Sequence, residues 1–119
     1  MNKQQEYLNA ITILYDEHIT DNLDNFRKNS WNDKSCCTNI KNFIESVEGQ
    51  LGLTFVDLPA GINTTEKNIV LMETDKDGFV IEKRIAAFRY AFGIYGGCFV
   101  SLKDYATNKY IRSFDKGCR

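Results

Sequence analysis

The hydrophobic positions of residues 3–28 recur with the period of an amphipathic α-helix. A rotation of about 100° per residue gathers six of them into one stripe, formed by Leu8, Ile11, Tyr15, Ile19, Leu23 and Phe26. Acidic residues fall on the opposite side. Arg27 and Lys28 close the last turn, where cations interact favourably with the helix dipole. Ile13 departs from the pattern because it projects among the acidic side chains. We therefore predict one long helix with an exposed Ile13.

A second stripe of helical period runs through residues 36–51. Its members are Cys36, Cys37, Ile40, Phe43, Ile44, Val47 and Leu51. The connection before it is short and polar, and it offers Ser35 or Asp33 as a cap for the helix. Gly49 or Gly52 marks the C-terminal end of this helix. The short connection predicts that the two helices pack as an antiparallel hairpin.

Beyond residue 52 the hydrophobic period shortens to that of β-strands. Five segments fit, namely residues 53–58, 68–74, 79–95, 98–105 and 109–114. Turn sequences separate them, at Pro59-Ala60-Gly61, Asp75-Lys76-Asp77-Gly78, Gly96-Gly97 and 106–108. Residues 82–95 also match a helical stripe. Their aromatic content and the glycines that follow favour a strand, bulged near Ala86-Ala87.

These elements predict an α+β fold, in which an N-terminal antiparallel helical hairpin packs on a mostly antiparallel sheet of about five strands. The 119 residues suffice for one modest hydrophobic core, so we predict a single domain over residues 1–119. Residues 60–66 are predicted to be a polar loop, and the tail after residue 114 is predicted to fray.

The net charge of −1 conceals an uneven distribution of charge along the chain. Residues 1–50 carry 5 basic and 8 acidic side chains, a net charge of −3. Residues 79–119 carry 8 basic and 3 acidic side chains, a net charge of +5, and nine of the 15 aromatic residues. The sequence thus predicts an acidic helical surface and a basic, aromatic surface on the sheet.

The acidic helical surface is the basis of our first functional hypothesis. An acidic strip with an apolar anchor suits the recognition of a basic partner protein. The candidate partner-binding residues are Ile13, Glu17, Asp21, Asp24 and Trp31. Asn, Ile and Lys make up 32 of the 119 residues, a composition typical of AT-rich bacterial or phage genes. We therefore expect a small interaction protein that neutralises a partner, such as a toxin or an enzyme, in the manner of immunity and inhibitor proteins. A homodimer is also compatible with the sequence.

The basic sheet surface supports an alternative, the binding of an anionic small molecule or nucleotide. Arginines neutralise phosphate and aromatic rings stack on bases. The candidate residues are Arg84, Arg89, Tyr90, Tyr110 and Arg112. Arg89 alternates with Phe88 and therefore points away from that ring, whereas Arg84 shares the parity of the aromatic residues unless a bulge shifts it.

A second alternative rests on the order of the elements. Helices followed by an antiparallel sheet resemble the architecture of small bacterial ribonuclease toxins, which implies cleavage of RNA by the same arginines and tyrosines. The slight net acidity opposes this hypothesis and makes nucleic acid an improbable partner.

Other function classes find no support in the sequence. No phosphate-binding loop, dinucleotide fingerprint or hydrolase motif is present, and the single His18 with no CxxC pair predicts no metal site and no cofactor. The N-terminus has no apolar signal region and no segment is long enough to span a membrane, so we expect a cytoplasmic protein. The spacing of the cysteines predicts free, mostly buried thiols at Cys36, Cys37 and Cys98, with Cys118 exposed.

Overall fold

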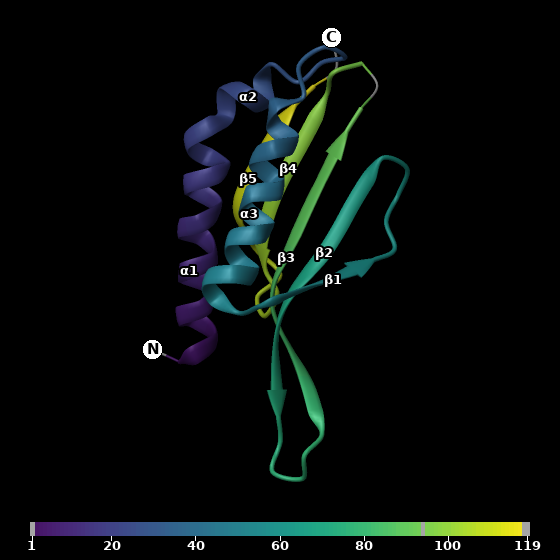
Figure 1. Ribbon diagram of the computed structural model, residues 1–119. Helices are drawn as coiled ribbons and strands as arrows, with labels where there is room; N and C mark the ends of the chain where they lie inside the picture. The colour runs from purple at the N-terminus through teal and green to yellow at the C-terminus, as the bar shows by residue number, and fades with distance from the viewer. Residues whose placement is uncertain (1, 94, 118–119) are drawn as a thin grey trace.

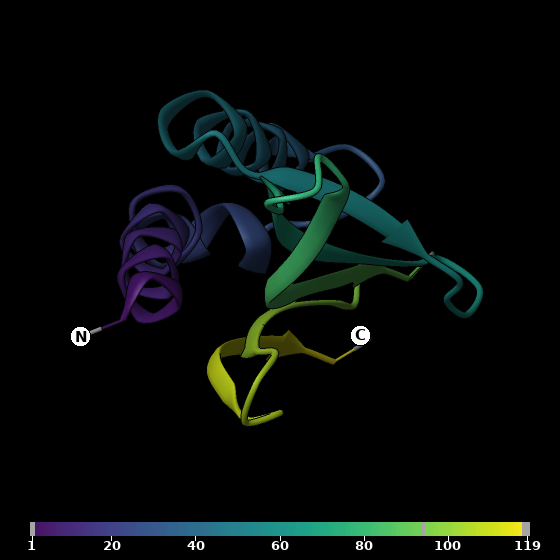
Figure 2. The ribbon, with the colours of Figure 1, turned by 90° about the horizontal axis from the view of Figure 1, so that it is seen from below.

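The computed structural model describes residues 2–93 and 95–117 and contains helices on one face of a five-stranded antiparallel sheet (Figures 1 and 2). The helical elements are α1 (Lys3–His18), η1 (Thr20–Asn22), α2 (Leu23–Arg27) and α3 (Ser35–Leu51). The strands are β1 (Thr54–Leu58), β2 (Thr64–Thr74), β3 (Val80–Phe92), β4 (Cys98–Asp104) and β5 (Tyr110–Lys116). The α+β class and the antiparallel sheet agree with the prediction.

The strands lie in the sheet in the same order as in the sequence, and every neighbouring pair is antiparallel. Figure 2 shows α1 and α3 on the same side of this sheet, so one sheet face is covered by helices and the other carries none. Among the described residues, no helix has the length and apolar character that crossing a membrane would need.

The core lies between the helices and the covered face. Aromatic rings fill its centre, where Phe43 of α3 meets Phe88 of β3 with ring centroids 4.7 Å apart. Tyr15 of α1 packs edge-on against both rings and donates a hydrogen bond of 3.0 Å from its hydroxyl to the Val100 carbonyl. The predicted stripe of the first helix is buried at its Leu8, Ile11, Tyr15, Ile19 and Phe26 positions and half-buried at Leu23.

The hydrophobic period predicted one continuous helix from residue 3 to residue 28, but the structure divides this segment. α1 ends at His18, where Ile19 turns to φ −116° and ψ −61°. The Asn22 side-chain amide donates to the carbonyls of Glu17 and His18, which satisfies groups that the next helical turn would have used. A 3₁₀ turn and the short α2 then complete the segment.

Three other predictions need correction. The loop predicted over residues 60–66 is shorter, because the β-branched Thr64 and Thr65 already pair with β3. The strand predicted over residues 79–95 ends at Phe92, because Gly93 opens a turn in which Gly96 adopts φ +92°. The C-terminal segment is paired through Lys116 instead of fraying after residue 114, since the Lys116 ammonium donates to the carbonyls of Arg27, the last residue of α2, and Asn29.

Two irregularities in strand pairing decide which side chains share a face. Between Ile69 and Val70 the pairing skips Ile85, and Ile85 and Ala86 both lie in the core. Between Leu102 and Lys103 the pairing skips Ile111 in the same way. Each extra residue inverts the alternation of the strand beyond it. The bulge expected near Ala86-Ala87 is therefore present at Ile85.

Candidate functional site

The helix-free face of the sheet has a hollow of about 250 Å³ above the middle of β3. Ala87 lies at its centre, and its methyl group leaves room between its cross-strand neighbours Asn68 and Lys103. Larger side chains surround this point, among them Glu66, Arg89, Tyr105 and Tyr110. We call this hollow the sheet cleft.

The floor of the sheet cleft is polar although it is almost completely buried. Asn68 is 3% exposed and Ser101 is 5% exposed. The Asn68 carbonyl oxygen accepts a hydrogen bond from the Arg84 guanidinium. Within the described part of the chain, neither the Asn68 amide nitrogen nor the Ser101 hydroxyl has a side-chain hydrogen-bond partner. Two polar groups at the bottom of the cleft are thus free to bond to a ligand.

The rim of the sheet cleft carries two cations that are held over aromatic rings. The Arg89 guanidinium lies 5.0 Å from the Phe99 ring centroid, and its Nε is 3.5 Å from the Glu66 carboxylate. The Lys103 ammonium lies 4.9 Å from the Tyr110 ring centroid. Two cations face one carboxylate, so the lining is electropositive and suited to an anion.

Three of the five residues predicted for ligand binding belong to this face. Arg89 and Tyr110 line the sheet cleft, and Arg84 is bonded to its floor through Asn68. Arg84 reaches this face because the extra residue Ile85 inverts the parity of β3. The conditional prediction that a bulge would move Arg84 away from the aromatic residues is therefore confirmed.

The other two candidates lie on the helix-covered face. The Tyr90 ring packs between Phe88 and Phe92, with centroids 5.4 and 5.8 Å away. Arg112 shares the parity of Tyr110, but the extra residue Ile111 turns Arg112 toward the helices. The five residues therefore do not form the single catalytic constellation that the ribonuclease hypothesis requires.

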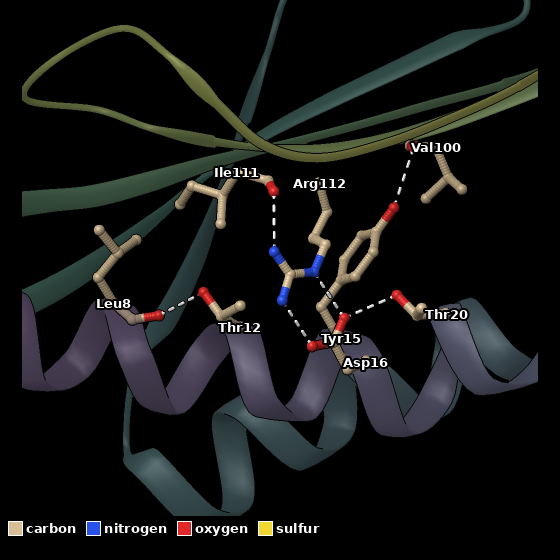
Figure 3. Close-up of polar contacts among 8 residues, drawn as sticks. All are labelled: Leu8, Thr12, Tyr15, Asp16, Thr20, Val100, Ile111 and Arg112. Carbon is tan, nitrogen blue, oxygen red and sulfur yellow. Dashed lines mark hydrogen bonds and ion pairs between the residues drawn. The ribbon is translucent and has the colours of Figure 1, made fainter.

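The Arg112 side chain of β5 binds to α1, as Figure 3 shows. Its Nε and Nη2 donate to the two oxygens of Asp16 at 2.8 and 2.9 Å, and its Nη1 donates to the Ile111 carbonyl at 3.0 Å. The hydrogen bond from Arg112 lowers the pKa of Asp16, and Asp16 raises the pKa of Arg112. This fork-shaped ion pair fastens α1 to β5, so Arg112 has a structural role.

The predicted partner-binding residues are all exposed but do not form one strip. Ile13, which is 59% exposed, and Glu17 lie one turn apart on α1. Asp21 belongs to the 3₁₀ turn, and Asp24 forms an ion pair of 3.1 Å with Arg27. Trp31 lies in the loop before α3 and is 87% exposed. The end of α1 at His18 divides the predicted strip in two.

Sequence reasoning missed the floor of the cleft and one of its cations. Asn68, Ser101 and Lys103 were not among the candidates, although the run from Phe99 to Lys103 alternates polar or aromatic with aliphatic residues. Val100 and Leu102 are buried in the core, which places Ser101 and Lys103 on the opposite face. That alternation could have identified Ser101 and Lys103 as residues of the helix-free face.

The cysteines do not form a reactive centre in the described residues. Burial raises the pKa of Cys36 to about 12 and also raises that of Cys98, so both thiols stay protonated. Cys37 is exposed, which corrects its assignment to the buried stripe, since it lies at the flank of α3. Cys118 lies outside the described residues.

His18 and the carboxylates give no sign of a metal centre. The His18 ring nitrogen Nε2 is 3.0 Å from the Ser46 hydroxyl, a contact between α1 and α3. No group of three or more His, Cys, Asp or Glu residues in the described ranges is arranged to hold a metal ion.

No family model, curated protein or solved structure matches the chain.

Proposed function

We propose that the protein is a binding module for a small anionic molecule and that the sheet cleft is its binding site. The observation that carries this proposal is the floor of the cleft. Two nearly buried polar side chains, Asn68 and Ser101, keep hydrogen-bonding atoms without a described partner beneath two cations. No buried side-chain nitrogen or oxygen atom of the described residues lacks a hydrogen-bond partner, so the unpaired atoms of Asn68 and Ser101 open into the cleft, where a ligand can bond to them.

The shape and charge of the cleft restrict the ligand. Its volume of about 250 Å³ lies below the roughly 300–1,000 Å³ of pockets that enclose drug-sized molecules. We expect one phosphate or carboxylate group to lie between Arg89 and Lys103. The Tyr105 and Tyr110 rings, both largely exposed, would contact an attached flat ring such as a base. A mononucleotide or an aromatic carboxylate fits this description.

Ligand-induced thermal stabilisation tests this proposal directly. Mononucleotides and aromatic carboxylates at millimolar concentration should raise the melting temperature. Ala87→Leu should abolish the shift by filling the cleft without changing its charge. Arg89→Gln should weaken binding about tenfold, because it removes a charged hydrogen-bond donor. Lys41→Gln on the exposed surface of α3 removes the same charge elsewhere and should change nothing. If no anion shifts the melting temperature, or if Ala87→Leu retains the shift, the proposal is wrong.

The exposed Ile13 supports a second candidate function, the neutralisation of a partner protein through α1. An isoleucine that is 59% exposed beside the exposed Glu17 provides an apolar anchor next to a negative charge. The triple variant Ile13→Asp, Glu17→Lys, Asp21→Lys should remain folded and lose the partner in a pull-down. Retention of the partner by this variant would exclude that surface as the binding site.

A further inference from the structure

The linked ends of β2 and β3 form an arm that projects beyond the rest of the molecule (Figure 1). β1 pairs with β2 only up to Val70, and β4 pairs with β3 only from Ala86 onward. Beyond these points Leu71–Thr74 and Val80–Lys83 pair only with each other within the described sheet. Both strands of the arm therefore have one free edge, whose backbone groups are available to a further strand.

The turn at the tip keeps the arm in a defined conformation. The Asp75 carboxylate accepts hydrogen bonds from the backbone N–H groups of Asp77 and Phe79, both at 2.9 Å. The Asp75 N–H donates to the Phe79 carbonyl at 2.8 Å, and Gly78 adopts φ +86°, which suits glycine. Glu73 lies 3.5 Å from the Lys83 ammonium and 3.8 Å from that of Lys3, so ion pairs link the two strands of the arm and connect it to α1.

Several large apolar side chains of the arm are exposed to solvent. Met72 is 44% exposed, Phe79 70%, Val80 63% and Ile81 47%. These are four of the ten large hydrophobic residues that are exposed in the described chain, and they lie within ten consecutive positions. Met72 and Val80 lie on one face of the arm and Ile81 on the other, so both faces expose apolar side chains. Isolated two-stranded hairpins are marginally stable in water, so an arm with exposed apolar side chains and free strand edges favours an interaction.

We propose that the arm pairs with the arm of a second copy of this chain, so that the two β3 edges form an antiparallel pair about a two-fold axis. Centred on Ile81, this alignment places Ile81 opposite Ile81 and Phe79 opposite Lys83. Each contact then occurs twice, as a two-fold interface requires. The Phe79 rings meet the Lys83 side chains of the other copy, which joins an aromatic face to a cation.

Charge disfavours one of the two neighbouring registers. Side chains that share a face are two residues apart along the strand, so the alignment can shift only in whole steps that preserve the faces. One step toward Arg84 places Glu82 opposite Glu82, and like charges directly opposite each other destabilise a strand pair. The alignment centred on Ile81 avoids this contact and keeps apolar residues at the axis.

Sedimentation analysis of the full chain over a range of concentrations tests the proposal. The wild-type protein should be a dimer whose dissociation constant rises at least about tenfold in Ile81→Lys, which places two lysines opposite each other. Ile62→Lys is the matched control, because Ile62 is 93% exposed in the loop between β1 and β2 and lies outside the arm. That variant should dimerise like the wild type.

A second measurement separates loss of dimerisation from loss of folding. Far-UV circular dichroism and the unfolding midpoint of Ile81→Lys, measured at a concentration where both proteins are monomeric, should match those of the wild type. Amide exchange at residues 79–83 should slow with increasing concentration in the wild type alone. A wild-type protein that is monomeric at every concentration would overturn the proposal. A dimer that Ile81→Lys leaves intact would do so as well.

Discussion

The two faces of the sheet present opposite chemistry from the same strands. On β3, Phe88 is completely buried against the helices, whereas the next residue, Arg89, has a side chain that is 45% exposed on the helix-free face. The covered face holds rings and aliphatic side chains that exclude water, and the open face holds cations, hydroxyls and an amide around a hollow. The residues that stabilise the fold and those that form the candidate site lie on opposite faces of the same strands. Each set can therefore be changed without changing the other.

The charges of the two halves of the chain are less separate in space than in sequence. Arg112 of β5 is paired with Asp16 of α1, and the Lys116 ammonium donates to the carbonyls of Arg27 and Asn29. Part of the basic excess of the sheet is therefore used to attach the helical segment to the last strand. The basic character left on the open face comes mainly from Arg89 and Lys103.

The largest expected effect lies on the covered face. Phe88→Ala removes a ring that contacts Tyr15, Phe43, Phe55 and Tyr90. The cavity that remains should cost roughly 3–5 kcal/mol of the free energy of unfolding. Denaturant unfolding measures this loss. Ala87→Leu, one residue away on the open face, is the matched control and should change the same free energy by less than about 1 kcal/mol.

A smaller effect is expected where α1 is fastened to β5. Asp16→Asn should lower the free energy of unfolding by about 1 kcal/mol at neutral pH, since the pair is partly exposed and screened. Folding lowers the pKa of Asp16, so the folded carboxylate releases its proton more readily than the unfolded one. The contribution is complete above the ordinary Asp pKa of 3.8 and is lost as the pH falls through the lower folded value.

Unfolding of wild type and Asp16→Asn at several pH values checks this sign. The difference between the two proteins should shrink on acidification. A difference that stays constant down to pH values far below 3.8 would mean that Arg112 does not stabilise the carboxylate.

The smallest effect on stability is expected at the floor of the cleft. The Ser101 hydroxyl has no hydrogen-bond partner in the described structure, so Ser101→Ala should change the free energy of unfolding by less than about 0.5 kcal/mol. The same variant should weaken the binding of any anion that stabilises the wild-type protein in the thermal assay. A large loss of stability in Ser101→Ala would show that the hydroxyl serves the fold and not a ligand.

Much of the fold was predictable because buried positions impose their period on the sequence. The helix stripe at Ile11, Tyr15 and Ile19 and the strand pair Val100 and Leu102 are buried, as their spacing indicates. The left-handed Gly52, at φ +67°, ends α3 and is one of the two glycines, Gly49 and Gly52, that the sequence offered for this end. The break after His18 was not predictable from the period, because the apolar stripe continues through the 3₁₀ turn to Phe26.

The candidate site was predictable only in part, because face assignment depends on counting residues along a strand. Simple alternation groups Tyr110 with Arg112 and separates Arg84 from Arg89, and the structure reverses both groupings. In each case one extra residue, Ile111 or Ile85, lies between the two members. The sequence indicated a bulge near Ala86-Ala87 but gave no sign of the one at Ile111, and it did not reveal the pairing of Arg84 with Asn68.

The bulge at Ile85 also has a consequence for how this chain tolerates insertions and deletions. Deleting Ile85 would restore regular pairing and would leave Arg84 opposite Val70 and Ala86 opposite Ile69, so the residues on both sides of the deletion would keep their faces. Deleting one residue elsewhere in the regular part of β3 would instead move every residue beyond it to the opposite face. The bulge is therefore a place in β3 where the chain can lose one residue without exchanging its two faces, and the loss is limited to the buried Ile85 side chain.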